Sequence, residues 1–579
     1  MTRFTMKYSQ KTTDLSASLV FFVAGTVYFS LCYGFHTLNL EQVQLFEGTW
    51  AYFAQTVSVP GGFSDYLGRF LTQFCYHAWS GALVIAALLL LIRTLLKRIC
   101  TRKDAVVGAA TFIPAILLMM VMCLRFPTIS LLTAFCLALA ASLAVSSIRK
   151  AKTRRIVLFL LIPVLYLLLG SFVILFAAIA AIKEHNWRFS MIALLLAVAC
   201  PLVASLFFPY PLGRLFYGLS YYKVHVQMPV WPWIAVAAAV AVVALAESPL
   251  LAENRILTGK GRVWLPYAVV AVFAVAAVLL SSSRSDEQSL KYNILAGKRA
   301  WNRIVTEATR KAPKTYSETA CLNLALCKTG HLGGHMFDFL QDGPETLLPN
   351  ENTPHHDGLS TAEIFYQLGM VNNARRYCFE ALNAVPDYQK SAPVFKLLAE
   401  ISLVNENYEM ARKYLTTLSH ARFYRRWAGQ QLALLQDIDG PLVEKDYLEK
   451  RFERYKGEDY IFDYNNADIS LRQLLVEYPG NLTALNYLLA WDLLKKDPVD
   501  FVGACPFEAF TSAVPKVWQE GFLIDWGQSG YSREDLPDFI APANAARYEA
   551  FIRDFNANVP MDKMQRNYGD TYWFYYFFK

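Results

Sequence analysis

The sequence lacks the short motifs that mark many enzymes and cofactor-binding proteins. It contains no phosphate loop, dinucleotide-binding fingerprint, nucleophile elbow or zinc-protease helix motif. Its ten cysteines form no CxxC pair and no zinc-finger spacing, so we expect them to be small buried hydrophobes. The sequence therefore indicates no reaction, and we expect neither a metal nor a cofactor.

Charged residues are missing from long stretches of the first half of the chain. The last such stretch runs from Trp264 to Leu280 and ends in the polar tail 281–286. At about 1.5 Å per residue, a run of this kind can cross a hydrocarbon core of about 30 Å. We therefore expect membrane before this point and a water-soluble helical region after it.

The composition agrees with such a division. Hydrophobic residues make up 55% of the chain, which is too apolar for a soluble enzyme and too polar for a pure transporter. The formal net charge is +8, but many basic residues fall in short loops between apolar runs, where they set membrane topology. We therefore predict membrane lipid as a partner and no nucleic acid.

The apolar runs predict a polytopic membrane domain. They begin after a polar N-terminus, residues 1–14, which we expect in the cytoplasm with the two basic loops 93–103 and 149–155. The predicted spans are Leu15–Phe35, Gly81–Ile92, Ala105–Leu124, Pro127–Ile148, Ile156–Ile182, Phe189–Phe208, Val230–Leu245 and Trp264–Leu280.

One run can be interpreted in two ways. Ile156–Ile182 suits either one long tilted helix or two short helices that turn at Gly170-Ser171. The hairpin separates basic residues between the two sides better, and it gives nine membrane segments with the soluble domain outside, which in a bacterium is the periplasm. A single helix would leave that domain in the cytoplasm.

The second half predicts amphipathic helices joined by short turns. Residues 362–386 place Leu368-Gly369, Ala374, Cys378, Ala381 and Pro386 at the offsets of a tetratricopeptide repeat (TPR), where small residues permit a close helix crossing. Residues 300–494 resemble this family with degenerate motifs. The resemblance implies a concave surface that binds peptides or proteins, and no catalysis.

The predicted fold class is therefore all-α, with a polytopic transmembrane helical domain followed by an α-helical TPR-like repeat domain. We expect the membrane domain at 15–281, a linker at 282–299 and the soluble domain at 300–579.

The whole chain is also similar to a family of uncharacterised multispan bacterial membrane proteins with a TPR-like C-terminal domain. The phrases that carry this resemblance are Pro60-Gly61-Gly62, the segment 69–74 and Tyr572-Trp573-Phe574. The resemblance implies no known activity.

The first outer loop, residues 36–79, contains the only candidate catalytic residues. We expect two amphipathic helices along the membrane interface, which carry Glu41, Glu47, Asp65 and Arg69. Multispan lipid-carrier-dependent glycosyltransferases keep acidic residues in this position, where a carboxylate can bind a cation or act as a general base. This loop has no adjacent Asp-Glu pair, and the alternative is that its charges are solvated helix faces.

Two further features call for an explanation. His331, His335 and the segment His355-His356-Asp357 could be assembled into a metal site, but Gly333-Gly334 interrupts the first pair and we expect loop histidines. Seven aromatic residues, 572–578, precede the final lysine. We expect them to be buried as a cap on the helical array, with the membrane headgroup layer as the alternative.

These predictions favour a membrane-anchored interaction protein of the bacterial inner membrane, whose TPR-like domain holds a protein or peptide partner in the envelope. A glycosyltransferase-like enzyme that uses the first outer loop is the alternative, and a solute transporter is the third.

Overall fold

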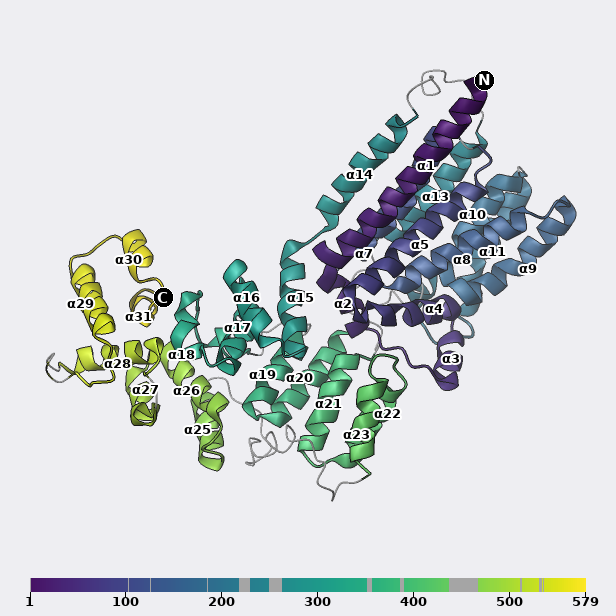
Figure 1. The fold of residues 1–579 in the computed structure, drawn as a ribbon. Coiled ribbons are helices and arrows are strands. Elements are labelled where there is room, and N and C mark those ends of the chain that lie inside the picture. The colour runs from purple at the N-terminus through teal and green to yellow at the C-terminus, as the bar shows by residue number, and fades with distance from the viewer. Residues whose placement is uncertain are drawn as a thin grey trace. The chain divides into compact units, whose positions relative to one another are not determined.

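The computed structural model is helical and divides into two units (Figure 1). It describes residues 2–102, 104–124, 127–184, 186–217, 230–248, 263–350, 357–385, 390–436, 467–510, 513–530, 534 and 536–579. The first unit contains residues 1–287, 385–392 and 417–428, and the second contains the remainder. Every regular element in the described residues is a helix, so the predicted all-α class is confirmed.

The first unit is a bundle of long apolar helices with three shorter helices at one end. Its elements are α1 (Thr2–Val27), η1 (Tyr28–Cys32), α2 (Gly34–Gln42), α3 (Trp50–Val57), α4 (Gly62–Thr72), η2 (Gln73–Tyr76), α5 (Ala78–Ile99), α6 (Ala105–Ala110), α7 (Phe112–Met122), α8 (Ile129–Ser146), α9 (Ala151–Leu169), η3 (Gly170–Phe172), α10 (Val173–Glu184), α11 (Trp187–Ala204), α12 (Leu212–Tyr217), α13 (Trp231–Glu247) and α14 (Leu265–Ser281).

Six helical segments of this unit are long and apolar enough to cross a membrane, which is compatible with an integral membrane protein. The first begins at Gln10, within helix α1, before the predicted start at Leu15. The segment around Gly81 also extends further than predicted, over Ala78–Ile99. Helix α13 is apolar but shorter, and α14 passes the same test only together with α15.

The ambiguous run forms a hairpin. It is continuous helix from Ala151 to Glu184, yet both Arg154 and Arg155, at its start, form ion pairs with Glu184 at its end. Gly170 lies at the turn with φ +63° and ψ −145°, a conformation that favours glycine. Helices α9 and α10 therefore begin and end at the same side of the bundle, as the hairpin interpretation predicts.

At one end of the bundle, here called the basic face, some helices end and the helices that follow them begin. Asp14 of α1 binds Arg93 and Lys97 near the end of α5, and Tyr267 at the start of α14 donates to it at 3.0 Å. Continuing around this face, Thr101 donates to Ala246 at the end of α13. Ion pairs then link α13 to α10 and α10 to α9.

The other ends of these helices lie at the opposite end of the bundle, here called the opposite face. The backbone N–H of Ser283, after α14, donates to the Tyr33 hydroxyl at 3.0 Å, and that hydroxyl donates to the Cys123 carbonyl after α7. Gly61 at the start of α4 donates to Leu167 near the hairpin turn. Helix α14 therefore leaves the bundle at the end away from the basic face.

Apolar side chains cover much of the outside of this unit. Leu19, Leu160, Leu195 and Leu279 are all more than 60% exposed, on α1, α9, α11 and α14. Exposed tryptophans lie where helices begin: Trp79 and Trp231 at the opposite face, and Trp187 and Trp264 at the basic face.

The second unit contains shorter helices, and its boundaries pass through α15, α21, α22 and α23. Its elements are α15 (Arg284–Gly297), α16 (Trp301–Arg310), α17 (Tyr316–Lys328), α18 (Leu332–His335), η6 (Met336–Asp338), η7 (Pro344–Thr346), α19 (Gly358–Leu368), α20 (Val371–Ala384), α21 (Ala392–Val404), α22 (Tyr408–Ser419), α23 (Arg425–Leu434), α25 (Ala467–Glu477), α26 (Leu482–Leu494), α27 (Pro498–Ala504), η11 (Phe507–Ala509), α28 (Lys516–Ser529), α29 (Pro542–Asn556), α30 (Met561–Tyr568) and α31 (Tyr572–Phe578).

Helices α19 and α20 form a tight helical hairpin. Gly369 ends α19 in the left-handed conformation, with φ +93°. Ala374 and Cys378 of α20 are fully buried. A Cβ atom on Gly358 would lie 3.0 Å from Ala381, so small residues are required where these two helices cross. Pro386, the predicted terminating residue, lies outside the described residues.

The C-terminal aromatic residues form helix α31, which packs on α28 within the second unit. Tyr572, Trp573, Phe574 and Tyr575 are buried, and the Tyr575 hydroxyl donates to the Leu494 carbonyl at 2.8 Å. The predicted burial of these rings in the helical region is confirmed.

Candidate functional site

Asp65 and Arg69, two of the predicted site residues, form an ion pair on α4. Their carboxylate and guanidinium atoms lie 2.5 Å apart at an i,i+4 spacing. The Ser130 hydroxyl of α8 donates to Asp65 at 2.7 Å, and Arg69 donates to the Tyr52 hydroxyl at 3.2 Å. Asp65 is buried, and its carboxylate therefore does not lie on a solvated face of α4.

Close packing holds α4 in this position. A Cβ atom on Gly68 would lie 2.4 Å from backbone atoms of Ser130, a separation that side chains do not adopt. Thr133 also donates to the Ser64 carbonyl at 2.7 Å. Gly68 is therefore what lets α4 approach α8 closely enough for Ser130 to reach Asp65.

The other two predicted residues have different partners. Glu47 forms an ion pair with Lys390 at 2.5 Å, and Glu41 accepts a hydrogen bond from the Tyr424 hydroxyl at 3.3 Å. The structure therefore brings Asp65 and Arg69 together, whereas Glu41 and Glu47 each contact a residue from much later in the chain.

The histidine candidates form no metal site in the part of the chain that the structure describes, where no group of three or more His, Cys, Asp or Glu residues could hold an ion. The His331 and His335 rings lie 5.9 Å apart, and His335 hydrogen-bonds to Asp338 at the surface. His355 and His356 lie outside the described residues, and Asp357 is buried.

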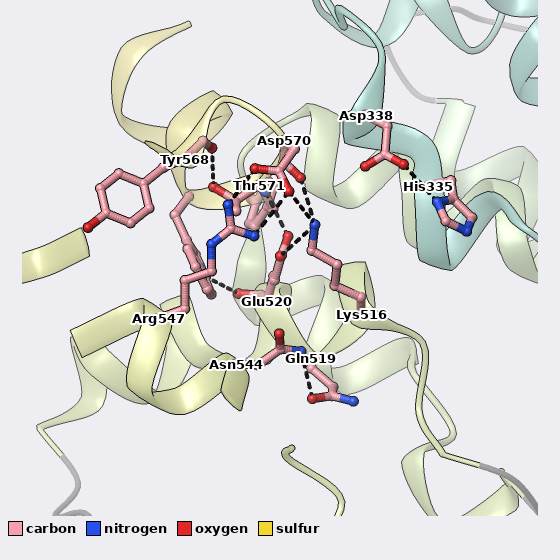
Figure 2. A network of polar contacts seen from close by, with 12 residues as sticks. His335, Asp338, Lys516, Gln519, Glu520, Asn544, Arg547, Tyr568, Asp570 and Thr571 are labelled. Atoms are coloured by element: carbon pink, nitrogen blue, oxygen red, sulfur yellow. Dashed lines mark hydrogen bonds and ion pairs between the residues drawn. The ribbon is translucent and has the colours of Figure 1, made fainter. Parts of the chain in front are cut away.

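A polar network that the sequence did not suggest surrounds the C-terminal helix (Figure 2). Glu520 of α28 is 0% exposed, and its carboxylate accepts the backbone N–H of Tyr572 at 2.8 Å. Its backbone carbonyl accepts the indole N–H of Trp573 at 3.2 Å. Glu520 therefore fixes the first turn of α31 through both its side chain and its main chain.

Three further charges complete this network, here called the C-terminal clasp: Lys516, Glu520, Arg547 and Asp570. Lys516 lies 3.7 Å from Glu520 and 2.8 Å from Asp570. Arg547 of α29 binds both carboxylate oxygens of Asp570, at 3.0 and 2.5 Å. The clasp therefore ties α28 and α29 to the turn before α31, as Figure 2 shows.

The two carboxylates of the clasp titrate in opposite directions. Burial raises the pKa of Glu520 to about 8, against the opposing effect of Lys516. Burial also opposes ionisation of Asp570, but hydrogen bonds from Arg547 and Lys516 outweigh it and lower the pKa of that carboxyl. One oxygen of Glu520 has no hydrogen-bond partner, which fits a carboxyl that is neutral near pH 7.

A second buried charge network lies among the repeat helices. Arg299, which has φ +53°, binds Glu363 of α19 at 2.6 Å and Glu400 of α21 at 2.5 Å. Gln367 donates to Glu363 at 2.6 Å, and burial raises the pKa of that glutamate. This network therefore links the turn after α15 to helices α19 and α21.

Comparison with known proteins gives one match. The sequence profile of a family of unknown function, DUF6057, matches residues 9–579. The chain belongs to the DUF6057 family. No curated protein and no solved structure matches it.

The match covers both units of this DUF6057 chain, as the predicted whole-chain resemblance to an uncharacterised family requires. The clasp is the feature that sequence reasoning missed. Its one local signal is the spacing of Lys516 and Glu520, four residues apart on what the structure shows to be helix α28. Nothing in the sequence pairs them with Arg547 and Asp570.

Proposed function

We propose that this chain is a membrane-anchored interaction protein, in which the first unit is the anchor and the TPR-like second unit binds a protein or peptide. The observation that carries the proposal is the α19–α20 hairpin. Its left-handed Gly369 and the fully buried Ala374 and Cys378 match the positions that the TPR resemblance assigns to the turn and the helix crossing. Helical repeats of this kind act through extended surfaces.

Membrane anchoring is supported by the outside of the first unit. Its exposed apolar side chains lie between helix ends that carry exposed tryptophans, such as Trp79 and Trp187. Tryptophan is enriched at the headgroup layers on both sides of a bilayer. Membrane lipid is therefore the proposed partner of this surface.

The proposed orientation of the first unit in the membrane is based on its basic face and its opposite face. Basic loops lie on the cytoplasmic side of membrane proteins, which assigns the basic face to the cytoplasm. Because α14 ends at the opposite face, the second unit would begin on the outer side. In the inner membrane of a bacterium, that side is the periplasm.

A reporter fused after Lys579 tests this orientation. Alkaline phosphatase, which is active only after export, should be active there, and a fluorescent protein that matures only in the cytoplasm should be dark. The same reporters fused after Ile148, in the loop before α9, should give the reverse result. A fluorescent C-terminal fusion would contradict the orientation.

Partner binding is tested by in-cell crosslinking from the second unit. A photoreactive residue at Phe379, which is 47% exposed on α20, should capture a defined protein band. The same probe at Phe365, a fully buried aromatic position on α19, is the matched control and should capture nothing outside the chain. Equal patterns from both positions would contradict the proposal.

The alternative function is a transferase that uses the outer layer. Its support is the buried Asp65–Arg69 pair, and the separate partners of Glu41 and Glu47 weigh against it. Under this hypothesis, Glu47→Gln and Asp65→Asn should abolish function with normal expression. The third hypothesis, a transporter, would be favoured by paired charges deep in the spans, whereas the Asp14–Arg93–Lys97 cluster lies at the basic face, at one end of the bundle.

A further inference from the structure

The basic face contains a group of cations that form no ion pair within the described residues. Arg149, Lys150 and Lys152 lie between α8 and the first turn of α9, and all three side chains are exposed. Arg188, at the start of α11, is also exposed. These four residues are here called the α9 patch.

Acidic residues are scarce in the part of the sequence around the α9 patch. Glu184 is the only acidic residue between Asp104 and Glu247. Both of its carboxylate oxygens are already occupied, one by Arg154 and the other by Arg155 at 2.8 Å. Within the described residues, none of the four patch cations has an ion-pair partner, so the patch carries a net positive charge at the end of the bundle.

Packing brings the two halves of the patch together. The Arg155 guanidinium lies 5.5 Å from the centre of the Phe189 ring, and the Phe159 and Phe189 rings lie 4.9 Å apart. The first turns of α9 and α11 are therefore neighbours, which places Arg188 beside the segment 149–152.

Trp187 indicates where the α9 patch would lie relative to the lipid headgroups of the proposed membrane. This side chain is 72% exposed, and the Arg188 guanidinium lies 5.5 Å from the centre of its ring. An exposed tryptophan at a helix end, next to apolar side chains such as Met191 and Leu195, is typical of the headgroup layer. Cations at this level lie beside lipid phosphates.

We propose that the α9 patch binds the headgroups of anionic phospholipids in the leaflet at the basic face. Its unpaired positive charge and its place beside an interfacial tryptophan fit a negatively charged phosphate surface, and each basic residue near such a surface strengthens the attraction. The inference rests on the proposed membrane anchoring, but it assigns the anchor a lipid class.

The test uses the full chain reconstituted into nanodiscs with equal amounts of phosphatidylglycerol and phosphatidylcholine. Native mass spectrometry then measures the ratio of the two lipids retained by the protein. The wild type should retain mainly the anionic lipid. In R149Q/K150Q/K152Q, the ratio of anionic to neutral lipid should fall by a factor on the order of ten. The enrichment should also fall as salt is raised.

Two controls separate charge from folding. K314Q/K563Q/R566Q removes the same charge from exposed positions of the second unit and should keep the wild-type ratio. R149K/K150R/K152R preserves the charge and should restore the enrichment. An unchanged ratio in R149Q/K150Q/K152Q would overturn the proposal.

Other outcomes have equally definite meanings. If R149Q/K150Q/K152Q loses co-purifying RNA while its lipid ratio stays at the wild-type value, the patch binds nucleic acid and the lipid proposal is wrong. If the wild-type chain stays soluble without detergent and enters no nanodisc, the membrane anchoring itself has failed.

Discussion

Exposed large apolar side chains are far more frequent in the first unit than in the second. In the first, Leu206, Phe207 and Leu280 are 80%, 77% and 83% exposed; in the second, Trp518 and Trp573 are 1% and 0% exposed. A helix that is apolar on all sides requires apolar surroundings, whereas the second unit must fill its own core. The comparison indicates that the two units are adapted to different solvents.

The two units also use charge differently. In the first unit, Asp14 and Glu184 each form ion pairs with two basic residues, and these basic residues lie near helix ends. In the second unit, Glu520 lies in the interior and holds the last helix. Removing an interior contact should therefore destabilise the second unit without altering the first.

The largest expected effect follows deletion of residues 572–579. Four of the lost aromatic residues are buried, and each buried ring contributes about 1.5 to 3 kcal/mol. Limited proteolysis of the full chain in detergent should then digest the second unit and leave the first unit protected. If both units keep the protease resistance of the wild type, α31 is not part of the core.

The next effect is in the first unit. Gly68→Ala introduces a Cβ atom against the Ser130 backbone, and overpacking of this kind costs about 1 to 3 kcal/mol. Gly429→Ala, on helix α23 with open space around it, is the matched control and should be neutral or slightly stabilising. The melting temperature of each variant in detergent checks the comparison, and equal values would contradict the close α4–α8 contact.

A similar or smaller effect is expected at the repeat hairpin. Ala374→Trp places a large ring at a fully buried crossing, so the second unit should lose about 1 to 3 kcal/mol. Phe379→Trp, at a position that is 47% exposed on the same helix, should be tolerated. Hydrogen exchange of the α19 and α20 amides measures the difference, and equal protection in both variants would show that the predicted repeat register is wrong.

The effect confined to the smallest part of the molecule is a pH dependence of the clasp. The pKa of Glu520 rises from 4.5 to about 8 on folding, so the folded state holds more protons between these values. Stability from this group is therefore complete below about pH 4.5 and is lost as the pH rises towards about 8. The pKa of Asp570 is lowered, so the stability that this carboxylate contributes is present above its ordinary pKa of 3.8 and is lost only as the pH falls below that value.

Glu520→Gln tests this dependence because it keeps the shape of the side chain and removes its titration. Protection of the α31 amides, corrected for intrinsic exchange, should decline with pH in the wild type and stay level in the variant. Glu508→Gln, at an exposed position, should behave as the wild type. A parallel decline in Glu520→Gln would assign the dependence to another group.

The parts of this fold that sequence could predict depend on residues close together in the chain. The turn at Gly170-Ser171 was predicted because loop charges balance best with a hairpin there. The left-handed turn at Gly369 was predicted because the small residues that follow it have repeat spacing. Among the candidate site residues, the Asp65–Arg69 pair has the i,i+4 spacing that brings side chains together on a helix.

The remaining contacts join residues with no local relation. Glu47 meets Lys390 across 343 positions, and Asp14 meets Tyr267 across 253. The clasp likewise combines α28, α29 and the turn before α31. Periodicity predicts where helices form, but the partner of each residue depends on how distant parts of the chain pack.

The α9–α10 hairpin also constrains how the chain can be inserted during synthesis. Helix α10 has 12 residues, which span roughly 18 Å at 1.5 Å per residue and fall short of a hydrocarbon core of about 30 Å. Under the proposed membrane anchoring, α10 is too short to cross a bilayer alone and would have to enter it together with α9. The pairing of Glu184 with Arg154 and Arg155 keeps these three charges together at the basic face, so that none of them would have to cross the bilayer.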